Sequence, residues 1–206
     1  MKINTNAWNK IRYSIYAPIY PFLIKVVAER TRAKSFELLA ARADEKILVV
    51  GGGTGADFPF LKNLKNVTAV DLTPDMVERM KLQREKLDAN IEVLEMDGQQ
   101  LQFPNETFDC VILHFIVAVI PDAEKCLCEA ARVLKPGGRV VVADKFLLTG
   151  EKAGWLRKLI EPIATLLFTT VNRNLSDLAA AANLKIKTVT AAPNANKLLR
   201  VALLEK

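Results

Sequence analysis

Three glycines and an acidic residue have the spacing of a nucleotide-binding turn. Gly51, Gly53 and Gly55 follow the apolar run at 47–50 and precede a segment expected to be helical. A strand, a glycine turn and a helix in this order bring the backbone close to a bulky or anionic ligand. Asp71 ends the next predicted strand, twenty residues after Gly51, where an acid accepts hydrogen bonds from ribose hydroxyls. The pattern predicts a site for a nucleoside-containing cofactor.

Two cofactor classes fit such a turn: dinucleotides and S-adenosylmethionine. The dinucleotide pattern requires Gly-x-Gly-x-x-Gly. Counted from Gly51, the third glycine comes one position early, at Gly55, and position 56 is Ala. S-adenosylmethionine has no pyrophosphate, so the glycines would instead make room for its methionine part and its ribose.

The elements that must position these residues alternate between strand and helix. The apolar pattern predicts strands at 46–50, 66–72, 90–97, 108–115, 139–147, 185–192 and 197–206. It predicts helices at 55–64, from Thr73-Pro74 onward, at 122–138, 151–170 and 175–183. Alternation of this kind favours a parallel sheet with helices on both faces, and the last two strands, with no helix between them, predict a closing antiparallel hairpin.

The composition is that of one globular domain. The chain has 206 residues, a net charge of +6 and three cysteines, and no linker divides it. The small positive charge fits an anionic partner and equally an ordinary soluble protein. Cys110, Cys126 and Cys128 have neither disulfide-framework nor zinc spacing, so we expect a reducing cytoplasm and no metal. No run of about 18 apolar residues predicts a membrane span.

Four stretches in order resemble successive motifs of class I S-adenosylmethionine-dependent methyltransferases. They are ILVVGGGTG, VTAVDLTPDMVERM, VLEMDGQQLQFPNETFDCVI and ARVLKPGGRVVVAD, within residues 44–146. The resemblance implies a Rossmann-like α/β fold with a seven-stranded, mostly parallel sheet and a final antiparallel hairpin. It also implies one domain over 1–206, with an N-terminal helical lid at 1–43 and a helical insertion over the substrate site at 151–171.

The resemblance implies a role for each matched position. Glycines 51, 53 and 55 would line the methionine part and ribose, and Asp71 would hold the ribose hydroxyls. The residues expected around the adenine are Leu72, Met76, Asp97, Gly98 and Gln99. His114 would lie near the methionine end or the substrate. One position departs from the pattern: many members carry an acid two residues before the first glycine, where this chain has Val49. Backbone carbonyls near Gly51 and His114 are then expected beside the cofactor ammonium.

The stretch HFIVAVIPDAEKCLCEAARVLKPGGRVVVADKFL is similar to that of bacterial phospholipid N-methyltransferases, which act on phosphatidylethanolamine. The Tyr-x-x-x-Tyr opening, Tyr16 to Tyr20, resembles the same group, but quinone-pathway methyltransferases share such openings. Both acceptors therefore stay open. The aromatic and basic residues of the N-terminal segment suit contact with an anionic membrane, which predicts a cytoplasmic protein with a peripheral site at the inner membrane.

Candidate acceptor-side residues follow from that resemblance. Tyr16 and Tyr20 could orient an amine, and His114 is a candidate base, although a lone His beside an apolar strand often has a structural role. Lys145 and Arg173 could meet the lipid phosphate.

Two other classes of function compete with a lipid or small-molecule acceptor. A nucleic-acid or protein methyltransferase has only the +6 charge in its favour, and no nucleic-acid partner is expected. The Asn/Asp-Pro-Pro-Tyr/Phe motif of amino-group methylases of bases is absent after the fourth strand, which reads LHFIVAVI. A non-catalytic binding module would keep the fold, and the Val49 departure gives that alternative its support.

Overall fold

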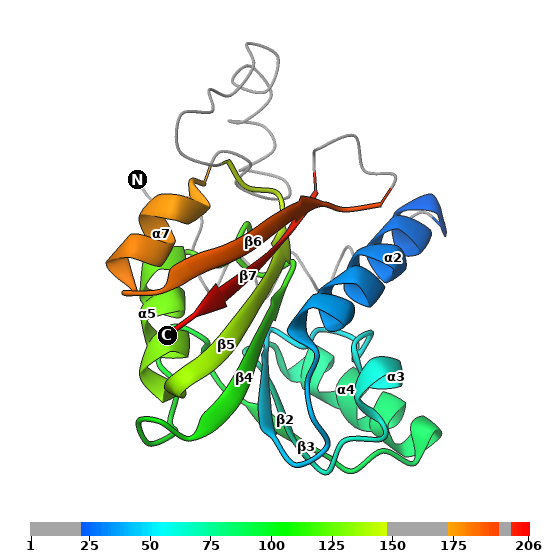
Figure 1. Ribbon diagram of the computed structural model, residues 1–206. Helices are drawn as coiled ribbons and strands as arrows, with labels where there is room; N and C mark the ends of the chain where they lie inside the picture. The colour runs from blue at the N-terminus through cyan, green and yellow to red at the C-terminus, as the bar shows by residue number, and fades with distance from the viewer. Residues whose placement is uncertain (1–21, 148–172, 194–198) are drawn as a thin grey trace.

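A seven-stranded mixed sheet forms the centre of the molecule (Figure 1). The computed structural model describes residues 22–147, 173–193 and 199–206. The strand order is β3-β2-β1-β4-β5-β7-β6. The strands are β1 (Lys46–Val50), β2 (Asn66–Asp71), β3 (Ile91–Glu95), β4 (Phe108–His114), β5 (Leu134–Asp144), β6 (Lys185–Ala191) and β7 (Arg200–Glu205). The first five run parallel and β7 is antiparallel to β5 and β6, which confirms the predicted fold class and closing hairpin.

Apolar side chains cover both faces of the sheet, because the parallel strands are buried on both sides. In β1, Leu48 and Val50 join one core cluster and Ile47 and Val49 the other, following the two-residue period of a strand. Helices α5 (Ala123–Val133) and α7 (Leu175–Ala181) cover the first face. Helices α2 (Phe22–Leu39), α3 (Phe58–Leu61) and α4 (Pro74–Leu87) lie on the other (Figure 1).

Two predicted helices are shorter than expected. The helix predicted at 55–64 spans only Phe58–Leu61, since Gly51, Gly53 and Gly55 all have positive φ and the turn continues to residue 57. The helix predicted at 122–138 ends at Val133, and Leu134 already pairs with Phe108 in the sheet. Pro136 explains the early end, because the residues before a proline avoid the helical conformation.

The sequence correctly placed other element ends. Thr73 is the N-cap of α4 with Pro74 at its start, and Asn174 caps α7 by accepting a hydrogen bond from the Ser176 amide. Asp122 caps α5 by accepting from the Lys125 amide. The helical insertion predicted at 151–171 lies outside the described residues, and so does the first half of the lid predicted at 1–43. The second half of that lid contains α2.

Candidate functional site

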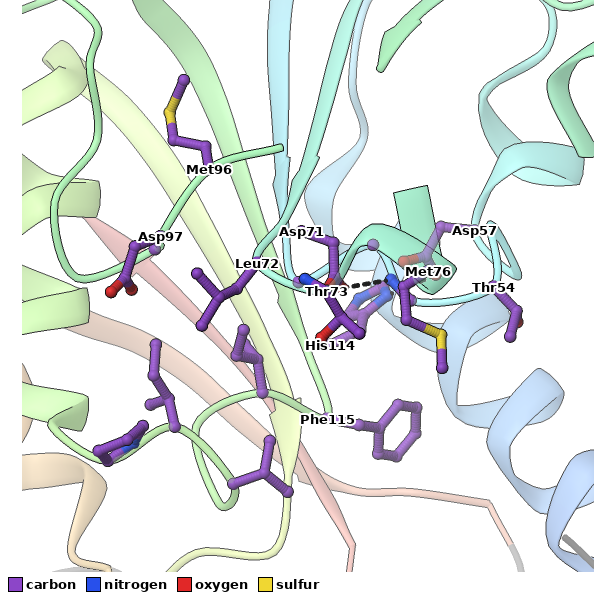
Figure 2. A pocket seen from close by; sticks show the side chains of 18 of the residues that line it. Thr54, Asp57, Asp71, Leu72, Thr73, Met76, Met96, Asp97, His114 and Phe115 are labelled. Atoms are coloured by element: carbon purple, nitrogen blue, oxygen red, sulfur yellow. Dashed lines mark hydrogen bonds and ion pairs between the residues drawn. The ribbon is translucent and has the colours of Figure 1, made fainter. Parts of the chain in front are cut away.

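A cavity opens at the carboxyl ends of the parallel strands, on both sides of the point where the strand order reverses between β1 and β4 (Figure 2). Ligands of open α/β sheets bind at this switch point. The turns after β1 and β2 and the segments after β3 and β4 supply most of the lining, and α2 adds Arg32. In Figure 2 the Asp97 side chain lies at one side of the cavity and Asp57 at the other, with Asp71 between them.

The carboxylate of Asp71 holds the glycine turn in place. Its Oδ2 accepts from the Gly53 amide at 2.9 Å and its Oδ1 from the Thr73 amide at 2.9 Å. Burial raises the pKa of Asp71 despite these two hydrogen bonds. A carboxylate has about four acceptor positions, so Asp71 can also accept from ligand hydroxyls in the cavity.

The glycines serve different purposes. A Cβ at Gly53 would meet nothing closer than the Gly51 oxygen at 4.0 Å, so this position borders open space. A Cβ at Gly55 would lie 3.1 Å from Gln83 Cβ of α4, so this glycine permits helix packing. Gly51 is covered by Ile116, whose Cδ1 would lie 2.2 Å from an added Cβ. Gly51 and Gly53 thus border the cavity, whereas Gly55, also predicted to line the cofactor, is absent from its lining.

Gln99 positions Asp97 rather than lining the cavity. Its amide donates to Asp97 Oδ1 at 2.9 Å, and its side-chain Nε2 donates to the same oxygen at 3.0 Å. Its Oε1 accepts from the Asp122 amide at 2.9 Å, which ties the segment after β3 to the start of α5. Asp97 and Gly98 line the cavity, and so do Leu72 and Met76 on the side of α4.

His114 lies at the end of β4 in a buried polar network. Its Nδ1 is 2.8 Å from Asp57 Oδ1, and its Nε2 is 2.6 Å from Ser35 Oγ of α2. Asp57 Oδ1 also accepts from Arg32 Nε at 2.8 Å. Burial alone would raise the pKa of Asp57, but His114 and Arg32 outweigh it and hold the pKa below its ordinary value. Both imidazole nitrogens are thus engaged, and this geometry favours a positioning role for His114 over that of a free base.

The order Ser35, His114, Asp57 matches the arrangement of a nucleophilic triad. A nucleophile must reach its substrate, however, and the Ser35 side chain is fully buried and is not part of the cavity lining. The contacts instead fasten α2 to the end of β4.

The far wall of the cavity is apolar, and its backbone is held by two charged side chains, the buried Asp144 and the half-buried Arg173. Residues 115–121 follow β4 and contribute Phe115, Ile116, Val119, Ile120 and Pro121 to the lining. Asp144 Oδ2 accepts from the Ala118 amide at 2.8 Å, and Arg173 donates to the carbonyls of Val117, Ile120 and Pro121. Burial raises the pKa of Asp144 and lowers that of Arg173.

Several predicted site residues lie away from the cavity. The guanidinium of Arg173 faces the carbonyls of this wall, and Lys145 is not part of the lining. A phosphate-binding role for Lys145 or Arg173 stays a prediction. The contacts of Arg173 with these carbonyls do not favour such a role for it. Tyr16 and Tyr20 lie outside the described residues. Within the described ranges, no three side chains of metal-binding type gather in one place.

Sequence reasoning missed Arg32, Ser35 and Asp57. A signal was available on α2: Thr31 and Ser35 are four positions apart, and both are fully buried on one helix face. Polar residues on the buried face of a helix need partners: Thr31 donates to the Val27 carbonyl of its own helix, so only Ser35 indicates a polar group beneath α2. Asp57 shortly follows the glycine turn, but its direction depends on the length of α3, which the pattern overestimated.

The residues present fit an adenosyl cofactor. Open space borders Gly53, the carboxylates of Asp71 at the end of β2 and of Asp97 just after β3 line one cavity, and apolar side chains lie beside them. Asp71 and Asp97, which the resemblance assigns to the ribose and the adenine, thus line the same cavity as the glycine turn.

Comparisons with known proteins point the same way. The family model described as a methyltransferase domain matches residues 48–142. The chain is 36% identical over 130 residues to a phosphatidylethanolamine N-methyltransferase of Cereibacter sphaeroides, covering 62% of this chain and 64% of the relative. It is also 36% identical over 114 residues to a demethylmenaquinone methyltransferase of Tropheryma whipplei, covering 55% and 47%. The chain thus spans less than two thirds of the length of these relatives.

Solved structures share the fold. A SAM-dependent methyltransferase from Aquifex aeolicus superposes with a TM-score of 0.64 at 20% identity, over 84% of this chain and 88% of that one. Among the described residues, no helix has both the length and the apolar character needed to cross a bilayer.

Proposed function

The chain belongs to the class I S-adenosylmethionine-dependent methyltransferases, and we propose that it transfers a methyl group from S-adenosylmethionine to a small or lipid acceptor. The observation that carries this proposal is the convergence of Gly53, Asp71 and Asp97 on one cavity at the switch point of the sheet. In this assignment Asp71 accepts from the ribose hydroxyls and Asp97 from the adenine amine, with Leu72 and Met76 beside the ring.

S-adenosylmethionine supplies a methyl group that its positive sulfur has already activated. The chain's own task is therefore to align the acceptor with the methyl group and to exclude water. The apolar wall at 115–121 suits the second purpose, and its backbone is fixed by Asp144 and Arg173. His114 contributes by fastening α2 and Asp57 to the end of β4.

The proposed acceptor is the amine of phosphatidylethanolamine at a membrane surface. The relative from Cereibacter sphaeroides supports it, as does the expected aromatic and basic N-terminal segment. The neutral amine nitrogen would attack the methyl carbon as the carbon–sulfur bond breaks, and the nitrogen would then release a proton. An ammonium at neutral pH must lose a proton before it can attack.

A quinone-type ring is the second candidate acceptor. The relative from Tropheryma whipplei supports it at the same percentage identity, over a shorter stretch. The apolar wall suits a ring as well as an acyl chain, so the wall alone does not separate the two candidates.

Labelled methyl transfer tests the proposal. Purified protein is incubated with methyl-labelled S-adenosylmethionine and either phosphatidylethanolamine liposomes or a demethylated quinone, and the products are separated by thin-layer chromatography. We expect label in the phospholipid, its loss in Asp71→Ala and its retention in Glu85→Ala, an exposed acid on α4. Label in the quinone alone would overturn the lipid acceptor, and no transfer to any offered acceptor would overturn the proposed activity.

A further inference from the structure

The end of β1 lacks the acid that many members of this family carry. Val49 occupies that position and is 1% exposed, packed in the core on the α2 side of the sheet. A cofactor whose amino-acid end carries an ammonium and a carboxylate must therefore find its charged partners elsewhere. Two charged residues border the cavity beside His114: Arg32 from α2, and Asp57 from the turn before α3.

We propose that Arg32 and Asp57 together bind the amino-acid end of the cofactor, Arg32 its carboxylate and Asp57 its ammonium. The inference deepens the proposed function and rests on it. Two residues outside the glycine motif would then bind the charged groups of the cofactor that the apolar Val49 cannot bind.

The pair is arranged so that each member keeps hydrogen-bonding capacity for a ligand. Arg32 uses Nε toward Asp57 Oδ1 at 2.8 Å, and its guanidinium carbon lies 4.9 Å from the centre of the Phe115 ring. Within the described part of the chain, its two Nη nitrogens have no hydrogen-bond partner, and neither has Asp57 Oδ2. A guanidinium edge matches a carboxylate, and a carboxylate oxygen matches an ammonium.

The Asp57 carboxylate is fixed, ionised and almost completely shielded from solvent. Its side chain is 4% exposed, and the His114 ring that supports it is itself held by Ser35. With Arg32 and His114 as partners, the pKa of Asp57 lies below its ordinary value, so the carboxylate stays charged at neutral pH. Charge-assisted hydrogen bonds are stronger where water is excluded.

The two residues come from different elements, which makes α2 part of the cofactor site. The Ser35–His114 and Arg32–Asp57 contacts both join α2 to the carboxyl end of the sheet. An α-amino acid group carries opposite charges on one carbon, and the Arg32–Asp57 pair presents opposite charges side by side. Ligands without that group gain nothing from the pair.

Titration calorimetry with two adenosine compounds tests the inference. S-adenosylhomocysteine carries the amino-acid end, whereas 5′-methylthioadenosine keeps the nucleoside and the sulfur but lacks it. Wild type, Arg32→Met and Asp57→Asn are compared, with Arg30→Met as the control because Arg30 is exposed on the same helix. Circular dichroism and thermal unfolding establish that each variant is folded.

We expect wild type and Arg30→Met to bind S-adenosylhomocysteine far more tightly than methylthioadenosine. Arg32→Met and Asp57→Asn should each weaken S-adenosylhomocysteine roughly 10- to 100-fold, the range for hydrogen bonds to charged groups, and leave methylthioadenosine within about twofold. If folded variants lose both compounds equally, or neither, the pair is a structural ion pair only and the inference is overturned. If wild type binds neither compound, the proposed cofactor fails, and the inference with it.

Discussion

Replacing Asp71 by alanine tests how the glycine turn is held. The Asp71 carboxylate accepts from the amides of Gly53 and Thr73, both at 2.9 Å. Alanine would leave both amides without this acceptor, in a region where Thr73 is 8% exposed. Asparagine offers one side-chain oxygen and can keep one of the two hydrogen bonds.

The magnitude follows from the cost of orphaned donors. Each buried N–H that loses its acceptor costs about 1–3 kcal/mol, and Gly53 borders the open cavity, where water can replace part of the loss. Removing the carboxylate also removes the free-energy cost of burying a charged group, the same cost that raises the pKa of Asp71, and this offsets part of the loss. We therefore expect Asp71→Ala to lower the free energy of unfolding by about 2–3 kcal/mol and Asp71→Asn by about 1 kcal/mol.

Urea denaturation at pH 7, followed by far-ultraviolet circular dichroism, measures both values. The slope of the unfolding free energy against urea should not change, since the same surface is exposed on unfolding. The control, Glu85→Ala, should stay within about 0.5 kcal/mol of wild type, because Glu85 is exposed on α4. An Asp71→Ala protein as stable as wild type would show that this carboxylate does not hold the turn.

Three further perturbations have expected outcomes. The pKa of Asp57 is depressed in the folded state, so the ionised carboxylate stabilises the fold above about pH 4, and this stabilisation is lost as the pH falls through the folded pKa. The difference in unfolding free energy between wild type and Asp57→Asn, measured by urea melts, should therefore shrink below about pH 4, and a difference independent of pH would contradict this. In a thiol-reagent titration, Cys128 should react first, since burial raises the pKa of Cys110 and of Cys126 to about 12, and rapid reaction of all three in native protein would be inconsistent with the fold. Gly51→Ala should lower the free energy of unfolding in urea melts by roughly 1–3 kcal/mol, because the Gly51 φ is 72° and the new Cβ meets Ile116. In an Ile116→Ala background the same change should cost less, and an equal cost would show that only the backbone conformation is strained.

The fold was predictable because its signals are local. The strand runs of β1 and β4 are continuous and apolar, Pro74 begins α4, and the hairpin of β6 and β7 has no helix between its strands. Element ends were less certain where backbone conformation decides them. The positive φ of Gly55 shortens α3, and the pairing of Leu134 with Phe108 ends α5.

The sequence by itself determined the strands and helices, their order along the chain, and the position of the glycine turn and its acid. Asp71 ends β2, and Asp97 lies two residues after the end of the neighbouring parallel strand β3, so the pairing of these strands brings both side chains to one edge of the sheet. Only the tertiary structure decided what His114 does. Its partners Ser35 and Asp57 are 79 and 57 residues away in the chain, and they meet it because α2 packs across the end of β4. A buried polar group must find a partner wherever packing provides one, and no local pattern encodes which residue that will be.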